Sequence, residues 1–267
     1  ALPGVPFEMK AMMTDGILPL LSKIKKDKEV VHKTVLTQGM GESFLAEKIA
    51  RWEDSLPSFI KLAYLPSPGL VRLRLTAIGK DKSKLLSEIN LQLKGLKKII
   101  GEYIVGYDNE TIESIVGKLL KEKKLTLSIA ESCTGGYLTH CITRVPGCSA
   151  YFKGSVVAYA YESKEKILGV KSSTLWKKGA VSEQAVIEMA LGCRKKIGTD
   201  YAIAVSGIAG PGGGTAGKPV GTMWICIAGK DTMTSSNFHF GNNRLVNIER
   251  AAVTAMHLLL KEIRSII

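Results

Sequence analysis

The sequence has few of the residues from which disulfide scaffolds and metal centres are built. Its five cysteines are odd in number and contain no C-x-x-C pair, which indicates reduced thiols rather than a disulfide framework or a zinc site. Its four histidines include no closely spaced pair of ligands. We therefore expect no metal and no cofactor.

Long apolar runs are also missing. No stretch approaches the ~20 residues that a membrane-spanning helix needs. The opening residues, ALPGVPFEMK, have neither the basic start nor the apolar block of a secretory signal. With the reduced thiols, these absences predict a cytoplasmic chain without a membrane partner. The chain also opens without a methionine, so we expect its start to be a cut through a longer protein.

Acidic residues are outnumbered, because 37 Lys and Arg face 24 Asp and Glu, for a net charge of +13. Much of the excess lies in Lys23–Lys33, Lys80–Lys98 and Lys118–Lys124. Such a balance permits contact with nucleic acid or attraction of phosphorylated small molecules. No aromatic stacking motif is interleaved with the lysines, so a solvated basic face is the better interpretation, and nucleic acid is not the expected partner.

Length and periodicity divide the chain into three parts. At 267 residues and 45% apolar content, the chain suits two domains at roughly 150 residues each. Residues 1–29 read as a Pro/Gly turn and short amphipathic helices at 7–13 and 17–24, the tail of a further domain. Residues 30–107 have the order β-α-β-β-α-β of a small KH-like α+β domain. They contain no G-x-x-G loop, through which KH modules bind nucleic acid, and so are expected to be a spacer or dimer element.

In residues 108–267 strands alternate with helices, which predicts an α/β fold arranged as a three-layer sandwich. Its centre is the stretch TLSIAESCTGGY, in which a strand at 126–130 meets a polar turn and a helix at 137–145. This geometry places Ser132, Cys133, Thr134 and several backbone N–H groups at the carboxyl edge of a sheet, beside a helix N-terminus. Such an edge can hold an anion or an oxyanion, although an ordinary Ser/Thr helix cap explains the pattern equally well.

Two other motifs are weaker. Gly212–Lys218 fits G-x-x-x-x-G-K, but Pro219 stands where a phosphate loop needs Ser or Thr, which argues against an NTPase. The glycine-rich loop 207–217 can still wrap a ligand with its N–H groups, or be a flexible connection. The S-x-x-K matches at Ser22 and Ser163 are short enough to arise by chance. Lys164 draws interest because it follows a strand expected at 154–161, beside the strand that ends at Ser132.

Six ordered motifs carry a resemblance to a known family: AESCTGG (130–136), GSVVAYAYESKEKILGV (154–170), GAVSEQAVIEMALG (179–192), SGIAGPGGG (206–214), KPVGTMW (218–224) and FGNNR (240–244). They resemble the C-terminal domain of the CinA family over residues 108–265. LPGVPFEMK resembles the end of that family's molybdopterin-binding-like domain, and residues 30–105 its KH-like middle segment. Active members are nicotinamide-nucleotide amidohydrolases. The resemblance therefore implies hydrolysis of nicotinamide mononucleotide to the acid and ammonia.

The resemblance also implies roles for single residues. It makes Ser132 the nucleophile and adds Lys164, Tyr159 and Ser206 to the catalytic set, with Arg244 in the phosphate site. A lysine base needs a pKa lowered to about 7–8, and we expect Lys164 to deprotonate Ser132 directly or through Tyr159. Ser206 and the N–H groups of residues 133–135 would stabilise the oxyanion. The expected substrate-binding residues are Thr134, Gly135, Gly207, Gly210 and Arg244.

Alternatives remain beside this hypothesis. Cys133 is a rival nucleophile, although its side chain should point inward, opposite to Ser132. Tyr161 stands where relatives often have asparagine, and Asn243 where they commonly have aspartate. A catalytically silent nucleotide-binding or scaffold protein linked to competence or DNA repair is therefore the second hypothesis. The long C-terminal helix and the exposed tail suggest a homo-oligomer.

Overall fold

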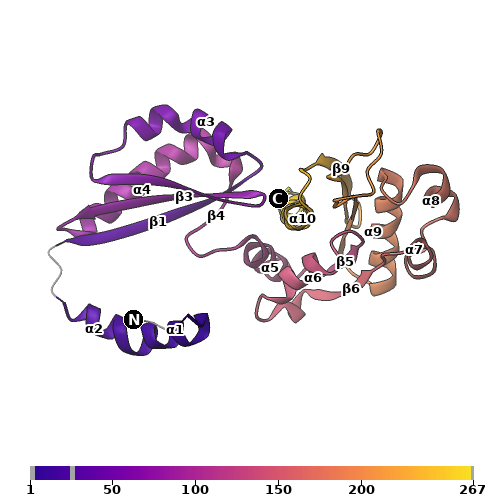
Figure 1. The fold of residues 1–267 in the computed structure, drawn as a ribbon, viewed down its shortest axis with the longest axis horizontal. Coiled ribbons are helices and arrows are strands. Elements are labelled where there is room, and N and C mark those ends of the chain that lie inside the picture. The colour runs from indigo at the N-terminus through magenta and orange to yellow at the C-terminus, as the bar shows by residue number, and fades with distance from the viewer. Residues whose placement is uncertain (1–3, 25–27, 266–267) are drawn as a thin grey trace.

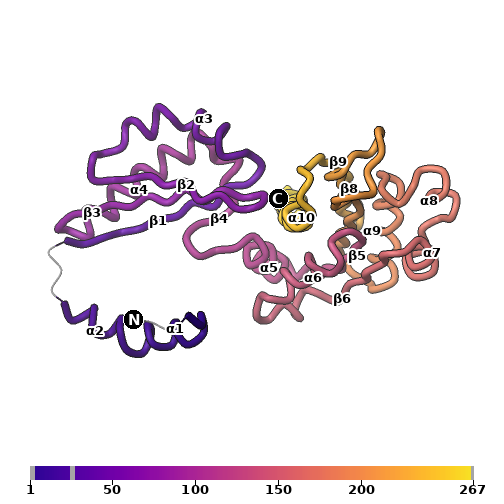
Figure 2. Tube along the Cα trace, viewed as in Figure 1, coloured from indigo at the N-terminus to yellow at the C-terminus, as the bar shows by residue number. Residues whose placement is uncertain are grey.

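In a computed structural model, the chain forms two sheets, each covered by helices, after a helical N-terminal segment (Figures 1 and 2). The structure describes residues 4–24 and 28–265. Parts of three predicted features lie outside these residues: the opening turn at 1–3, residues 25–27 of the basic run, and the end of the C-terminal helix at 266–267.

The N-terminal segment is helical and lies apart from both sheets in Figures 1 and 2. It consists of α1 (Pro6–Met12), a π-helical turn (Met13–Ile17) and α2 (Leu18–Ser22). The sequence predicted two short helices here, and the structure joins them through the π-helical turn. None of these residues is buried, so the segment has no hydrophobic core of its own.

The first sheet confirms the predicted β-α-β-β-α-β order. Its strands are antiparallel in the order β2-β3-β1-β4, and α3 and α4 cover one face (Figure 1). Alternation in β3 buries Val71, Leu73 and Leu75 under these helices. The elements are β1 (Glu29–Gln38), α3 (Glu42–Asp54), β2 (Ile60–Ser67), β3 (Leu70–Gly79), α4 (Lys82–Ile100), a 3-10 turn (Gly101–Tyr103) and β4 (Ile104–Tyr107).

The second sheet is the middle layer of the predicted three-layer sandwich. Its strand order is β6-β5-β7-β8-β9, with β6, β5 and β7 parallel and the rest antiparallel. Its elements are α5 (Ile112–Glu122), β5 (Leu127–Glu131), α6 (Tyr137–Thr143), a 3-10 turn (Cys148–Ala150), β6 (Phe152–Val157), α7 (Tyr161–Leu168), α8 (Ser172–Lys178), α9 (Glu183–Ile197), β7 (Tyr201–Gly207), β8 (Thr222–Ala228), β9 (Met233–His239) and α10 (Arg244–Arg264).

One strand prediction was wrong in its boundary. The strand expected at 154–161 ends at Val157, and α7 begins at Tyr161. The apolar and aromatic residues between them resemble a continuing strand in sequence. In the structure, the Ala158 N–H still donates to Glu131 O, but the chain then leaves the sheet edge. Tyr159 therefore lies in a loop, and Lys164 on a helix.

The two faces of the second sheet differ in side-chain size. Branched residues such as Ile129 and Ile203 face α5, α6 and α10, whereas alanines such as Ala130 and Ala204 face α7, α8 and α9. Small residues let α9 approach the sheet closely. At Gly192 of α9, an added Cβ would overlap the backbone of Leu168 at the end of α7. This close approach fixes the position of α7 in the fold.

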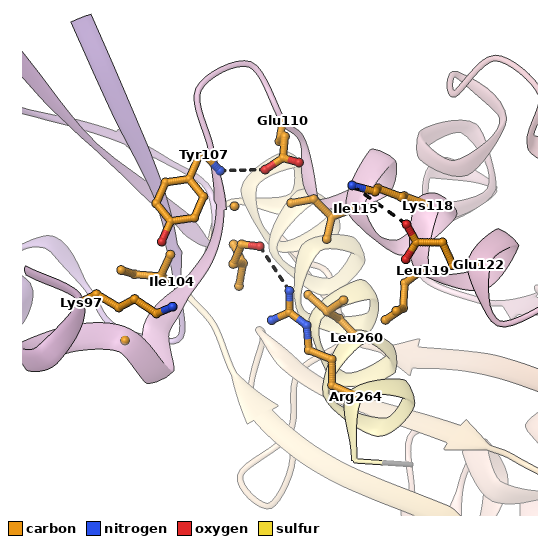
Figure 3. Close-up of a pocket in the computed structure, with 13 residues that line it drawn as sticks. Lys97, Ile104, Tyr107, Glu110, Ile115, Lys118, Leu119, Glu122, Leu260 and Arg264 are labelled. Atoms are coloured by element: carbon orange, nitrogen blue, oxygen red, sulfur yellow. Dashed lines mark hydrogen bonds and ion pairs between the residues drawn. The ribbon is translucent and has the colours of Figure 1, made fainter. Parts of the chain in front are cut away.

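The two domains share buried residues. Leu36 of β1 and Val105 of β4 belong to the hydrophobic core of the second domain, and Gly69 in the β2–β3 turn lies against Val253 of α10. Figure 3 shows one side of the junction, a cavity of about 460 Å³ where Arg264 of α10 donates to Val105 O at 3.5 Å. The domains are therefore packed together rather than joined by the chain alone.

Candidate active site

Ser132 lies directly after β5, at the carboxyl edge of the second sheet. Its N–H donates to Val205 O at 3.0 Å, which continues the pairing of β5 with β7 by one residue. The five residues of β5 are all buried, and Ser132 itself is 9% exposed. Its side chain lines a cavity of about 270 Å³. The position therefore presents one hydroxyl to a cavity at a sheet edge, as predicted.

Lys164 reaches the same point from α7. Its Nζ lies 3.0 Å from Ser132 Oγ, 2.7 Å from Ala158 O and 3.0 Å from Tyr159 O. The side chain is 1% exposed, and burial lowers its pKa to about 8. No carboxylate lies within ion-pair distance of it in the described part of the chain. A neutral amine at this distance can remove a proton from a hydroxyl.

Arg244 closes another side of the cavity. Its guanidinium donates to Gly210 O at 2.8 Å and to the Tyr159 hydroxyl at 3.1 Å. Lys164 contacts the backbone carbonyl of Tyr159, and the phenol, on a residue 60% exposed, is bonded to Arg244. The structure therefore brings Tyr159 to the site without placing its phenol between Lys164 and Ser132. Of the two predicted proton routes, the geometry supports the direct one.

The rest of the cavity is made by the loop after β7. It is lined by Ser132, Cys133, Tyr159, Lys164, Ala180, Val181, Ser206, Gly207, Ile208, Ala209, Gly210, Gly212, Gly213 and Arg244. Gly210 has a φ of +94° and lies against Val220, a conformation that favours glycine. The Ser206 hydroxyl donates to Ala180 O at 2.8 Å. Its proton is therefore already engaged, and this detail does not match its predicted role as an oxyanion donor.

Two predicted substrate-binding residues lie outside this lining. Thr134 is 3% exposed, and its hydroxyl has no hydrogen-bond partner among the described residues. Gly135 donates its N–H to Ser132 O at 3.0 Å, so that group is not free to bind an oxyanion. Gly207 and Gly210 do line the cavity. The turn thus supplies fewer donors than its sequence suggested.

Glu131 was missed by the sequence reasoning. Its buried carboxylate accepts the N–H groups of Gly136, Leu138 and Thr139 and the Thr139 hydroxyl. The N–H groups at the start of α6 are therefore already bonded to a side chain of the protein, so an anion or oxyanion at this sheet edge has to be bound by other donors. An acidic residue just before a helix was the signal that could have indicated it.

Asn247 on α10 was missed as well. It is fully buried, and its Nδ2 donates to Ala209 O at 3.0 Å and to Gly241 O at 2.7 Å. These bonds hold the glycine-rich loop against the start of α10, where Arg244 lies. No local sequence pattern indicates this role. Ala209 is 38 residues from Asn247, and both Ala209 and Gly241 lie outside the helices and strands.

Cys133 packs inward, as its alternation with Ser132 predicted. It is 6% exposed, and its Sγ lies 3.5 Å from Met223 Sδ. Burial raises the pKa of the thiol to about 12. The thiolate, which is the reactive form of cysteine, is therefore disfavoured. This environment argues against Cys133 as the nucleophile.

The two departures from the family pattern have structural roles. Asn243 is the N-cap of α10 and accepts the Val246 N–H through Oδ1 at 3.2 Å, which asparagine does about as well as aspartate. Tyr161 packs edge-on against Trp176 with ring centroids 5.8 Å apart. Neither side chain lines the cavity. We find no steric obstruction of the cavity at either position.

The described residues contain neither a metal-binding cluster nor a helix suited to a membrane. Within 4–24 and 28–265, no group of three His, Cys, Asp or Glu side chains is arranged to hold a metal ion. Over the same ranges, no helix combines the length and apolar character needed to cross a bilayer.

Comparisons with known proteins agree with this architecture. Residues 109–263 match the family model of the CinA C-terminal domain, and residues 32–106 match that of the damage-inducible protein CinA KH domain. A CinA-like protein of Flavobacterium psychrophilum is 50% identical over 98% of this chain and 63% of its own length. One of Cytophaga hutchinsonii is 44% identical over 100% of this chain and 64% of its own length. The chain thus spans a little under two thirds of these relatives.

Solved structures resemble the second domain. A CinA superfamily protein of Klebsiella pneumoniae superposes with a TM-score of 0.56 at 32% identity, covering 58% of this chain and 96% of its own. One of Escherichia coli gives a TM-score of 0.55 at 32% identity, covering 58% of this chain and 92% of its own. The chain belongs to the CinA family.

Proposed function

We propose that this protein is an amidohydrolase that converts nicotinamide mononucleotide to nicotinate mononucleotide and ammonia. Membership of the CinA family supports a function of this class. The observation that carries the proposal is the 3.0 Å contact between the buried Lys164 Nζ and Ser132 Oγ at the wall of a cavity. A serine and a neutral amine in contact are the parts that nucleophilic attack on an amide needs.

The surroundings of Lys164 suit a base. Its neutral amine keeps two N–H bonds, which the carbonyls of Ala158 and Tyr159 can accept. The nitrogen lone pair is then left for the Ser132 hydroxyl. Both carbonyls belong to the turn between β6 and α7, so they hold the amine in place. Because the pKa is lowered to about 8, a substantial fraction of the lysine is neutral near physiological pH.

The reaction then proceeds in two steps. Ser132 Oγ attacks the carboxamide carbon while its proton passes to Lys164 Nζ, and the Lys164 ammonium returns that proton to the departing nitrogen, which leaves as ammonia. Water next attacks the ester carbon and gives up a proton to Lys164 Nζ. The bond between that carbon and Ser132 Oγ then breaks, the Lys164 ammonium returns the proton to Ser132 Oγ, and the acid leaves. Overall, one amide and one water give one acid and one ammonia.

Backbone N–H groups near Ser132 are candidates for the oxyanion site. The N–H groups of Cys133 and Thr134 donate to no other described residue, and those of Ala209, Gly210 and Gly212 in the facing loop are likewise without a described acceptor. Removing one such donor typically costs about 10²–10³ in rate. These groups replace Ser206 and Gly135, whose protons are engaged.

The phosphate of the substrate is assigned to Arg244 and the glycine-rich loop. Arg244 uses two of its nitrogens for Gly210 O and the Tyr159 hydroxyl, but a guanidinium has five N–H bonds. It is the cationic residue with an exposed side chain in the lining. The net charge of +13 also attracts an anionic substrate.

The test is release of ammonia from nicotinamide mononucleotide by the purified chain. Ser132→Ala and Lys164→Met should each lower kcat by at least about 10³-fold, because each removes one partner of the attack. Ser163→Ala and Lys166→Met are matched controls on α7 outside the cavity, and Cys133→Ala tests the rival nucleophile. All three should keep turnover within about fivefold.

If the Ser132→Ala variant released ammonia at the wild-type rate, the assignment of Ser132 as the nucleophile would be contradicted. Binding of the mononucleotide by calorimetry without any release of ammonia would favour the second hypothesis, a silent nucleotide-binding or scaffold protein.

A further inference from the structure

We propose that the cleft between the two domains is a second small-molecule site, which takes a mononucleotide. The cleft has a volume of about 520 Å³, within the range of about 300–1,000 Å³ typical of ligand pockets. One wall is the end of β1 with the start of α3 and the β2–β3 turn, and the other is the end of β9 with α10. It shares no lining residue with the cavity at Ser132.

One end of the cleft has the features of an anion site. Helix α3 begins after the turn Gly39-Met40-Gly41. Its N-cap is Gly41, which has no side chain to cap the first N–H groups of the helix. The first N–H groups of a helix have no partner inside it, and here they open where Gly41 and Glu42 line the cleft. Arg250 lines the opposite wall and makes no hydrogen bond or ion pair to another described residue. A phosphate between them would meet donors from both domains.

Gln38 is an independent sign of a ligand. Its side chain lies in the lining at the end of β1 and is 6% exposed, yet its Oε1 is fully covered without a hydrogen-bond partner in the described structure. A buried acceptor left unpaired costs about 1–3 kcal/mol. A ligand group that donates a hydrogen bond would satisfy this oxygen.

The β9 side of the cleft suits a planar ring. Phe238 and Phe240 lie stacked with ring centroids 5.9 Å apart and an angle of 18° between their planes, and both line the cleft. Aromatic faces of this kind bind flat heteroaromatic groups. Glu42, the first residue of α3, places one carboxylate in the lining; it opposes part of the charge of a phosphate there, and it can accept hydrogen bonds from the hydroxyl groups of a sugar. Phosphate, sugar hydroxyls and ring together describe a nucleotide.

The experiment is titration calorimetry of the whole chain with AMP, adenosine and ribose 5-phosphate as probes. AMP should bind more tightly than either fragment, because the phosphate and the ring have separate subsites. Arg250→Ala and Gln38→Leu should each weaken AMP binding by about tenfold or more. Arg51→Ala removes a positive charge from the exposed part of α3, outside the lining, and should change binding by less than about twofold.

A further arm separates this cleft from the cavity at Ser132. Arg244→Ala should leave the AMP dissociation constant within about twofold, so loss of AMP binding in Arg244→Ala with retention in Arg250→Ala would overturn the proposal. No AMP binding to the wild-type chain at millimolar concentration would overturn it as well. Arg250→Lys and Gln38→Glu conserve size should the first variants fail to fold. Arg250→Lys loses the planar fork of the guanidinium, and Gln38→Glu adds a carboxylate, so both should weaken AMP binding. A nearly unchanged dissociation constant in both variants would count against the proposal.

Discussion

At Lys164, two opposing effects set the charge of a single amine. Three oxygens surround Nζ and favour the ammonium, whereas burial favours the neutral form, and burial prevails because the pKa falls to about 8. The neutral form is the one that can act as a base.

We therefore predict that kcat/KM for ammonia release rises with pH and levels off above about pH 8. Below that pH, each unit should lower the rate about tenfold, because the fraction of neutral amine falls tenfold. Initial rates between pH 6 and pH 10 measure this profile. A rate that stays flat from pH 6 to pH 9 would show that no group with this pKa limits the reaction.

His257 is a second buried titratable side chain, distant in the chain from the catalytic pair. It is 8% exposed on α10, and burial, followed by the nearby charges of Lys261 and Arg264, lowers its pKa to about 4. Its Nδ1 has no partner in the described structure. The folded protein therefore holds this imidazole neutral, whereas an unfolded chain binds a proton near pH 6.5.

The free energy of unfolding should consequently be fully maintained above about pH 6.5 and decrease as the pH falls toward 4, because the unfolded state binds the extra proton. The loss can reach on the order of 2–3 kcal/mol. Urea unfolding of the wild type and of His257→Gln at pH 7 and pH 5 measures it. The variant should lose less stability on acidification, and the exposed His239→Gln should behave like the wild type; equal losses in all three would contradict the assignment.

Among the elements, α7 depends on α9 for its position. A Cβ at Gly192 would overlap the Leu168 backbone, which cannot yield as a flexible side chain does. Gly192→Ala should therefore destabilise the protein by about 1–3 kcal/mol and lower turnover, because α7 carries Lys164. Thermal unfolding and the ammonia assay measure both effects.

Gly95→Ala is the matched control in α4. A Cβ there meets Trp52 only at an ordinary distance of 3.5 Å, and alanine is preferred over glycine inside a helix by about 0.5–1 kcal/mol. This variant should be as stable as the wild type or more so. Equal destabilisation by both substitutions would mean that the helix contacts do not explain the effect at Gly192.

Across the whole molecule, the two domains share one core at their junction. Leu36 and Val105 come from the first sheet but lie in the core of the second domain, and the β2–β3 turn contacts α10 at Gly69. We expect the domains to unfold in one cooperative transition, with equal calorimetric and van't Hoff enthalpies. Scanning calorimetry measures this directly.

A matched pair of variants sharpens that prediction. Leu36→Ala should lower the free energy of unfolding by about 2–5 kcal/mol and so lower the midpoint of the single transition. Leu91 lies on the exposed side of α4 and is 59% exposed, so Leu91→Ala should leave the midpoint almost unchanged. Two resolved transitions in the wild type would show that the junction does not couple the domains.

Local patterns in the sequence determined the element order, the two-domain α/β architecture and the strand-turn-helix unit that carries Ser132. Hydrophobic periodicity and turn residues act over a few neighbours, and that range is enough to specify such units. The inward orientation of Cys133 followed from the same alternation. The motifs of residues 130–244 were also sufficient to indicate the CinA family.

Tertiary structure alone decided which side chains meet. It ended β6 at Val157, directed the Tyr159 phenol to Arg244, filled the end of α6 with the Glu131 carboxylate, and placed the Lys164 amine against Ser132, 32 residues away. Each result depends on burial and on partners from distant segments. The lowered pKa of Lys164 depends on them too, since charge follows the environment of the folded side chain and not its place in the sequence.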